Sequence, residues 1–372
     1  MKIGLNATCI NDRPSGAKQR FVGIYRELVK SLPDTEFVVY EPSDCRVGAW
    51  FEGASNVSVH TTPLPSEGRA QKFLNGLNYW PKALSAENLD LFECFSQPIV
   101  KARNAQTLLT IHDIRRIHPD WSGWERMLYK AALAKDLRAV DHVITVSQAM
   151  KDEILDFYPN ASVSVVYNGF EASVFKAVTE ANLFEVRHKF KLPQTFALAV
   201  GHLERRKNYL RLIDAMAQLC GRGLGCDLVI VGNDSGEKSA ILERVQSANL
   251  TGRVHILSGI SDLEVRCLYK LCSLFVFPSS YEGFGIPILE AMAAGCPMVL
   301  SDIPVFREIT ENRGVYFSHD NPIAMAIAIE KVLTSSCERE RQIKYGQERV
   351  QAFNFKNLVN QVAGLYRTVL HR

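Results

Sequence analysis

Hydrophobic and polar positions follow a repeating order along the chain. Short apolar runs end at turns, and longer stretches follow in which apolar side chains recur at the three-four spacing of an amphipathic helix. In the first half, the runs that predict strands are Lys2–Ala7, Glu36–Tyr40, Leu89–Phe92, Thr107–Ile111, His142–Val146 and Val163–Val166. Alternating strands and helices favour an α/β fold with a parallel, doubly wound sheet, whose ligand sites lie at the carboxyl ends of the strands.

The same order begins again in the second half. The strands predicted there are Phe196–Val200, Asp227–Val231, Arg253–Ile256, Leu274–Phe277, Met298–Leu300 and Val315–Phe317. Helices are predicted at Asn208–Leu219, Ser239–Ala248, Leu263–Leu271 and Ile286–Ala294, and a last amphipathic pattern runs from Phe355 to Leu370. Because Gly169 to Pro193 has no sustained strand pattern, we expect it to link two domains, residues 1–175 and 190–352. A cleft between two such domains is a favoured place for ligands.

Composition narrows the class of protein. The 372 residues suit two domains, and 47% hydrophobic with 22% charged residues excludes a disordered chain. With 43 Lys and Arg against 40 Asp and Glu, the net charge of +3 argues against a nucleic-acid binder. Nine cysteines without C-x-x-C spacing argue against a zinc or disulfide framework and favour the reducing cytosol. We expect no signal peptide, and the sequence contains no apolar run long enough to span a membrane.

The most informative segment, Tyr281 to Pro297, follows a predicted strand. Gly285 permits a tight turn, and Pro287 suits the first turn of a helix whose free N–H groups would face an anion such as a diphosphate. Glu282 and Glu290 flank this turn and could accept hydrogen bonds from a polyhydroxylated ligand. Two glutamates eight apart also arise by chance, but the glycine-rich turn between them favours a ligand site.

A second segment, Gly201 to Asn208, follows the first strand of the second half. It contains three consecutive cations, Arg205, Arg206 and Lys207, which are costly to gather at a strand end without an anion. A diphosphate would supply that anion through charge-assisted hydrogen bonds. The alternative is a solvated charge run. We expect the Asn208 side chain to cap the following helix.

The first half offers two weaker candidates. His112 and Asp113 close a predicted strand, where His112 could contact a sugar hydroxyl or phosphate and Asp113 could orient it or meet an acceptor. A structural histidine is an equal alternative. The loop from Arg13 to Arg20 places Gly16 before a helix, which is an anion-friendly turn, although a single glycine does not make a dinucleotide fingerprint. An ordinary strand-to-helix loop is the alternative there.

Two stretches, Arg69–Lys82 and Arg115–Lys130, mix cations with aromatic residues. Such mixtures suit a membrane interface, and they equally suit a helix whose aromatic face packs in the core. The sequence leaves both interpretations open.

Together these segments resemble the retaining glycosyltransferases of family 4, which have the GT-B architecture, along essentially the whole chain. Glu282 through Glu290 fits the E-x7-E motif of that family, and Glu-Ala-Met-Ala-Ala-Gly-Cys-Pro continues it. Gly201 to Asn208 looks like the family's phosphate-binding loop. The resemblance implies two Rossmann-like domains facing a central cleft, the first binding the acceptor and the second the nucleotide sugar. It also implies that the final helix, 355–372, packs back on the first domain.

The resemblance also implies roles for single residues. Arg206 and Lys207 would hold the diphosphate, Glu282 would meet donor-sugar hydroxyls and Glu290 the ribose. The implied donor-binding set is Gly16, Arg205, Arg206, Lys207, Glu282, Phe284, Gly285, Ile286 and Glu290. The implied catalytic set is His112, Glu282, Arg206 and Lys207, with Asp113 toward the acceptor. Many members carry Arg or Thr where this chain has His202, so Arg205 or Arg206 can substitute for an arginine there.

The chemistry of the family requires no metal and no cofactor, and the sequence has no Asp-x-Asp motif. Cleavage of the anomeric bond places negative charge on the leaving diphosphate, which cations and amides would stabilise. Retention is attributed to attack on the same face, with the leaving phosphate taking the acceptor's proton, so no protein nucleophile is assigned.

The donor is expected to be GDP-mannose, because the loop looks most like those of bacterial mannosyl- and rhamnosyltransferases of surface-polysaccharide and lipopolysaccharide assembly. The alternatives are dTDP-rhamnose or a UDP-sugar. An epimerase, a phosphorylase or a non-catalytic sugar-nucleotide-binding protein on the same architecture also remain open. The acceptor is expected to be a glycan, free or linked to a polyprenyl carrier, met in the cytoplasm with a peripheral contact on the inner face of the cytoplasmic membrane.

Overall fold

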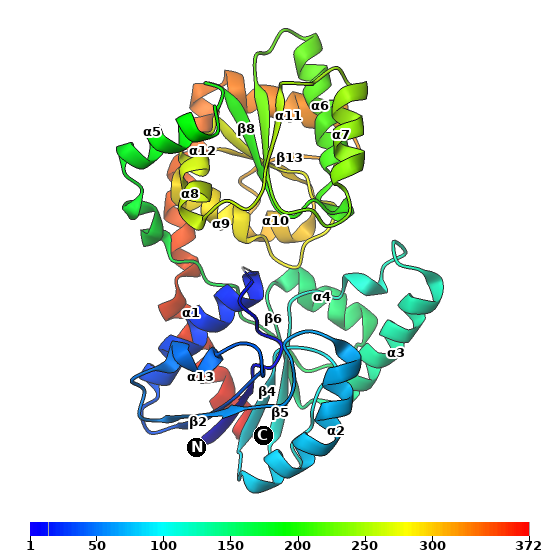
Figure 1. The fold of residues 1–372 in the computed structure, drawn as a ribbon, viewed down its shortest axis with the longest axis vertical. Coiled ribbons are helices and arrows are strands. Elements are labelled where there is room, and N and C mark those ends of the chain that lie inside the picture. Colours follow the sequence, from blue (N-terminus) through cyan, green and yellow to red (C-terminus); the bar gives the residue numbers. More distant parts are fainter. Residues whose placement is uncertain (14, 372) are drawn as a thin grey trace. The chain divides into compact units, whose positions relative to one another are not determined.

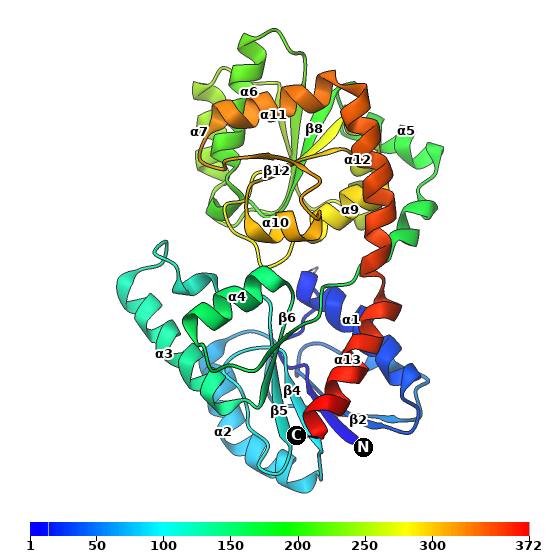
Figure 2. The same cartoon turned by 180° about the vertical axis from the view of Figure 1, so that it is seen from behind.

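The computed structural model describes residues 1–13 and 15–371. Pro14 of the predicted anion-friendly loop and Arg372 of the predicted last helix lie outside these residues. Contacts divide the chain into two units, Met1–Gly169 with Phe353–Arg372, and Phe170–Ala352. Figure 1 and, from behind, Figure 2 show that each unit is a sheet flanked by helices. The predicted α/β class, with parallel doubly wound sheets, is confirmed.

The first unit is built on a parallel sheet in the order β3-β2-β1-β4-β5-β6-β7. Its strands are β1 (Lys2–Asn6), β2 (Glu36–Glu41), β3 (Val57–Thr61), β4 (Leu91–Cys94), β5 (Gln106–Ile111), β6 (His142–Thr145) and β7 (Val163–Val165). The sequence analysis missed β3. This strand lies at the edge of the sheet and is largely exposed, so it lacks the apolar run that marks a buried strand.

The helices of the first unit cover this sheet. They are α1 (Gly16–Ser31), α2 (Arg69–Ala86), α3 (Gly123–Ala139), α4 (Gln148–Phe157) and α13 (Phe355–Leu370), with short 3-10 turns η1 (Val47–Phe51) and η2 (Arg115–Ile117). Helix α13, near the C-terminus, packs against α1, near the N-terminus. A Cβ at Gly23 would lie 2.1 Å from the ring of Phe355, so this close approach requires glycine.

The second unit repeats the architecture with the order β10-β9-β8-β11-β12-β13. Its strands are β8 (Phe196–Val200), β9 (Asp227–Val231), β10 (Val254–Leu257), β11 (Leu274–Phe277), β12 (Met298–Ser301) and β13 (Val315–Phe317). The order of the strands reverses between β8 and β11, which is where ligands bind in open α/β sheets. The two most informative sequence segments follow these two strands.

The helices of the second unit include the segment expected to be a linker. They are α5 (Glu180–Lys189), α6 (Tyr209–Gly221), α7 (Lys238–Ser247), α8 (Asp262–Leu271), α9 (Ile286–Ala294), α10 (Pro304–Ile309), α11 (Pro322–Thr334) and α12 (Ser336–Arg349), with 3-10 turns η3 (Ala172–Ala177), η4 (Arg205–Lys207) and η5 (Val350–Phe353). Helix α5 begins with a capping box at Thr179 and packs on α8. Among the described helices, none is long and apolar enough to cross a bilayer.

Candidate functional site

The loop after β8 is shaped by two close glycines. Gly201 has φ of +148°, and a Cβ there would lie 2.8 Å from Cε of Lys207. A Cβ at Gly232, after the neighbouring strand β9, would lie 2.0 Å from the carbonyl oxygen of Gly201. Both positions therefore exclude a side chain, and the backbone turns tightly enough to return Lys207 over the end of the strand.

Asn208 does not cap α6 with its side chain, as the sequence analysis expected. Its backbone is left-handed, with φ of +59°, and its side chain makes no capping bond. Instead the amide nitrogen donates to the carbonyl oxygens of Pro278, at 3.1 Å, and His319, at 2.6 Å. Asn208 thus ties the phosphate-loop candidate to the segments that follow β11 and β13.

A compact charge cluster forms where the two loops meet. Oε1 of Glu282 lies 2.7 Å from Nζ of Lys207 and 2.6 Å from Nη1 of Arg206. Glu204 makes a second ion pair with Arg206, at 2.6 Å. The Lys207 and Glu282 side chains are only 8% and 11% exposed, whereas Arg205 is exposed. The alternative of a solvated charge run therefore does not describe Lys207.

The electrostatics of the cluster hold Glu282 as a carboxylate. Burial raises the pKa of Glu282, but the adjacent charges of Lys207 and Arg206 outweigh this effect and bring the pKa to about 2. Burial lowers the pKa of Lys207, while the carboxylate of Glu282 opposes that change. The two cations share an internal counter-ion, and a diphosphate could replace it with charge-assisted hydrogen bonds.

The loop after β11 leads directly into a helix start. Gly285 has φ of +142°, and a Cβ there would meet Ile288 and Phe306 at 3.2 Å, so the predicted tight turn needs glycine. Helix α9 begins at Ile286 with Pro287, which has no N–H, in its first turn, and the N–H of Ile288 donates to the carbonyl oxygen of Gly285 at 2.9 Å. Phe284, beside this turn, is buried. The positive end of the helix dipole at this start favours an anion.

Glu290 lies one turn into α9 and has a different partner. Its Oε2 accepts a hydrogen bond of 2.9 Å from the hydroxyl of Tyr269, which lies on α8. Burial raises the pKa of Glu290, and the bond from Tyr269 opposes that rise. The sequence analysis missed Tyr269, because a tyrosine at an apolar helical position is indistinguishable from a core residue.

The first-unit candidates lie at the carboxyl edge of their own sheet. Gly16 is the first residue of α1, and Ser15 caps this helix by accepting from the backbone N–H of Lys18 at 3.2 Å. His112 directly follows β5 and is partly exposed. Burial and the positive charge of Arg20 lower the pKa of His112 to about 3, so the imidazole is neutral at physiological pH. Asp113 is exposed.

A buried polar network supports this edge and was also missed. Arg20, on α1, is 1% exposed and donates through Nη1 to the carbonyl oxygens of Val166, at 2.7 Å, and Tyr167. Glu93 on β4 is fully buried and accepts a hydrogen bond from the Tyr366 hydroxyl of α13. Buried charges must be bonded to persist, so these contacts fix α1 and α13 on the sheet.

The two aromatic and cationic stretches divide between the alternatives. Trp80 of α2 is buried against Tyr40 and Phe92 of the sheet, but other large apolar side chains on α2 and α3 face solvent with 55% to 71% of their surface exposed. These exposed residues are Phe73, Leu74 and Leu77 on α2 and Trp124, Met127 and Leu128 on α3. The side chain of Arg69 lies outside the described part of the chain. We call these six residues the apolar patch.

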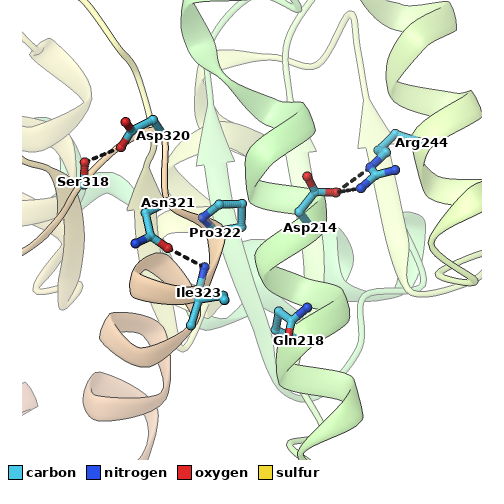
Figure 3. Close-up of a pocket in the computed structure, with 8 residues that line it drawn as sticks. All are labelled: Asp214, Gln218, Arg244, Ser318, Asp320, Asn321, Pro322 and Ile323. Atoms are coloured by element: carbon cyan, nitrogen blue, oxygen red, sulfur yellow. Dashed lines mark hydrogen bonds and ion pairs between the residues drawn. The ribbon is translucent and has the colours of Figure 1, made fainter.

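One depression lies elsewhere on the second unit, between α6, α7 and the start of α11 (Figure 3). It has a volume of about 530 Å³, and six of its eight lining residues are of polar type. Asp214 and Arg244 pair with each other there, and Asn321 caps α11 by accepting from Ile323. Five of its polar residues are thus engaged in local structure, namely Asp214, Arg244, Ser318, Asp320 and Asn321. Within the described residues, no group of three or more metal-ligating side chains could hold a metal ion.

Comparison with known proteins agrees with this architecture. The family Glycosyltransferase Family 4 matches residues 15–174, and the family Glycosyl transferases group 1 matches residues 182–349. The O-antigen chain mannosyltransferase RfbU of Salmonella typhimurium is 30% identical over 241 residues, which are 64% of this chain and 64% of RfbU. O-antigen chain mannosyltransferase B of Escherichia coli is 27% identical over 270 residues, 71% of each protein. The match to RfbU spans less than two thirds of that relative.

Solved structures extend the likeness over the whole chain. HepE from Anabaena, solved with UDP and glucose, superposes with a TM-score of 0.77 at 20% identity and covers 99% of this chain and 100% of HepE. A glycosyltransferase from Rickettsia africae superposes with a TM-score of 0.77 at 18% identity, covering 99% and 98%. Such likenesses show the fold. With a family 4 domain followed by a group 1 domain, the chain belongs to the glycosyltransferases with the GT-B fold.

Proposed function

We propose that this protein transfers mannose from GDP-mannose to a glycan or polyprenyl-linked glycan acceptor, with retention at the anomeric carbon and without a metal ion. The observation that carries the proposal is the buried cluster of Arg206, Lys207 and Glu282 at the point where strand order reverses, beside the start of α9. The similarity to O-antigen mannosyltransferases supports mannose as the sugar.

The contacts described above and the resemblance to family 4 support the proposed roles. Arg206 and Lys207 exchange Glu282 for the donor diphosphate, which also accepts from the amides at the start of α9. Glu282, once released, accepts hydrogen bonds from donor-sugar hydroxyls. Glu290 accepts from the ribose.

The first-unit residues complete the proposal. Gly16, at the start of α1, lines the phosphate side of the site. His112, neutral at physiological pH, can exchange hydrogen bonds with the transferred sugar without adding charge. Asp113 meets the acceptor.

The reaction is the exchange of one glycosidic bond for another. The bond from the anomeric carbon to the diphosphate oxygen breaks, a new bond forms on the same face to the acceptor oxygen, and the leaving phosphate takes the acceptor's proton. Preorganised cations and amides stabilise the charge that develops on the diphosphate. No protein nucleophile takes part.

Calorimetric titration with GDP, UDP, dTDP and ADP tests the site. We expect binding of GDP, and a loss of at least tenfold in affinity in Lys207→Met because a charge-assisted contact to phosphate disappears. Lys344→Met is the matched control, since Lys344 is an exposed lysine on α12 outside the cluster and its loss should leave affinity nearly unchanged. An unaltered affinity in Lys207→Met would overturn the diphosphate assignment, and selective binding of UDP or dTDP would replace the donor.

Turnover distinguishes an enzyme from a binding protein. GDP-mannose and a mannose-containing acceptor should give a glycosylated product whose anomeric configuration, measured by NMR, matches that of the donor. The rate should be the same with and without EDTA. Tight GDP binding with no transfer to any acceptor would favour the non-catalytic alternative.

We also propose a peripheral membrane contact through the apolar patch, at the inner face of the cytoplasmic membrane. Helices α2 and α3 each expose three large apolar side chains, and burial of Trp and Leu at a bilayer interface is favourable. The double variant Trp124→Ser, Met127→Ser should lose flotation with vesicles of bacterial phospholipids. Ile323→Ser, Ile327→Ser, which changes an exposed apolar pair on α11, should float like wild type. Equal flotation of both variants would contradict the proposal.

A further inference from the structure

The hydroxyl of Tyr269 occupies a fixed position beside Glu290. Tyr269 is only 1% exposed, and its ring packs at 5.4 Å from Phe275 of β11 and 6.3 Å from Phe175 of η3, measured between ring centroids. A tyrosine held on two sides cannot follow a moving partner. The 2.9 Å bond to Oε2 therefore determines where the carboxylate of Glu290 points, and not the reverse.

The second carboxylate oxygen of Glu290 is left available. Among the described residues, no side chain or backbone group donates a hydrogen bond to Oε1, and the Glu290 side chain is partly exposed. A carboxylate has about four acceptor sites, of which Tyr269 fills one. The remaining sites suit a pair of vicinal hydroxyls, which need two acceptors at a fixed spacing.

We propose that Tyr269 is a positioning residue that orients Glu290 and thereby sets the preference of the site for ribonucleotides over nucleotides that lack ribose hydroxyls. This inference rests on the proposed function, in which Glu290 meets the ribose. It adds a residue on α8 that does not touch the ligand. Without the tyrosine hydroxyl, the Glu290 side chain is free to change rotamer. Nucleotide binding must then fix that rotamer, and the conformational entropy lost in doing so weakens binding.

Removal of the hydroxyl should therefore act only through the ribose. Tyr269→Phe keeps the ring and its packing, so the core beneath α8 is preserved. We expect it to weaken GDP binding about tenfold, the scale of a hydrogen bond to a charged group. The rate at saturating donor should stay within about twofold, because the reacting bond is not touched.

The decisive measurement compares GDP with 2′,3′-dideoxy-GDP by calorimetry in wild type and Tyr269→Phe. Wild type should bind the dideoxy nucleotide at least about tenfold more weakly. Tyr269→Phe should bind GDP nearly as weakly as wild type binds the dideoxy nucleotide, and should bind the dideoxy nucleotide like wild type. Tyr345→Phe is the matched control, since its hydroxyl donates to the carbonyl of Thr310 at 2.9 Å, and it should preserve the ribose preference.

Each result decides the proposal. An equal loss for both nucleotides in Tyr269→Phe would show a merely structural role and overturn it. Equal binding of both nucleotides by wild type would overturn it as well, by removing the ribose contact while leaving the diphosphate site intact. Failure of wild type to bind any nucleotide would instead defeat the proposed function. If Tyr269→Phe does not fold, Phe175→Leu provides the test: it removes one of the two ring contacts that hold Tyr269, so it should weaken the binding of GDP more than that of the dideoxy nucleotide, and an equal loss for both would overturn the proposal.

Discussion

Replacement of Glu282 by glutamine removes the carboxylate that Arg206 and Lys207 share, and it should destabilise the second unit. Breaking a buried ion pair from one side commonly costs about 3 to 5 kcal/mol, because the remaining charges lose their partner. Arg206 keeps its contact with Glu204 and is 25% exposed, so we expect a loss near the lower end, about 3 kcal/mol at neutral pH.

The dependence of this loss on pH follows from the pKa of Glu282. The folded protein holds that pKa at about 2, below the unfolded value of 4.5, so the carboxylate contributes stability above pH 4.5 that is lost as the pH falls toward 2. The lowered pKa corresponds to about 3 kcal/mol, of which about 2 kcal/mol disappears between pH 6 and pH 3. The gap in unfolding free energy between wild type and Glu282→Gln should narrow by that amount.

Urea unfolding can assign the effect to one unit. All four tryptophans lie within Met1–Gly169, so their fluorescence follows the first unit, whereas far-UV circular dichroism follows both. The variant should shift the circular dichroism transition and leave the fluorescence transition in place. Glu243→Gln, an exposed position on α7, is the control and should match wild type at every pH. A gap that does not change between pH 6 and pH 3 would refute the electrostatic reasoning.

Three further predictions test packing and chemistry elsewhere. Gly232→Ala should lower the melting temperature of the second unit and weaken GDP binding, because its Cβ would lie 2.0 Å from the Gly201 carbonyl oxygen; calorimetry that shows neither change would contradict the close approach. Arg20→Met should destabilise the first unit by about 3 kcal/mol, as followed by tryptophan fluorescence in urea, since two buried carbonyls lose their donor. Diamide should oxidise Cys272 and Cys296, whose sulfurs lie 3.2 Å apart, to a disulfide seen by peptide mapping and reversed by dithiothreitol; reaction at other cysteines first would count against this pair.

The sequence predicts the strands that are buried on both faces and the helices that bury one continuous apolar stripe. The run Leu274–Phe277 coincides with β11 and Ile286–Ala294 with α9, because a central parallel strand and a buried helix leave unbroken apolar patterns. The edge strand β3, Val57–Thr61, has no such pattern because most of its side chains meet water. Helix α5 also went unpredicted, since its polar surface left only Val186 buried.

The site was predictable only as far as its residues are local in sequence. Glycines and charges at the strand ends indicated Arg206 and Lys207 as site residues. Their ion-pair partner, Glu282, lies 75 residues beyond Lys207, so local sequence could not identify it as the partner. Buried polar partners are harder still. The bond from Tyr366 to Glu93 spans 273 residues, and no pattern in either segment signals it. Such pairs arise from the topology of the sheet, which the sequence determines only through the complete fold.

The charge cluster also bears on the order of events in the proposed reaction. Two cations share the carboxylate of Glu282, so an entering diphosphate takes Arg206 and Lys207 at the expense of a buried anion. When the intact donor is bound, its sugar hydroxyls can donate hydrogen bonds to the displaced carboxylate of Glu282. Binding of the sugar therefore strengthens binding of the diphosphate, and the reverse. After transfer, the nucleoside diphosphate remains without those hydroxyls, and an unpartnered buried carboxylate is costly. The carboxylate of Glu282 then competes with the diphosphate for Lys207 and weakens binding of the nucleoside diphosphate product. Glu282 would thus both recognise the donor sugar and promote release of the spent nucleotide.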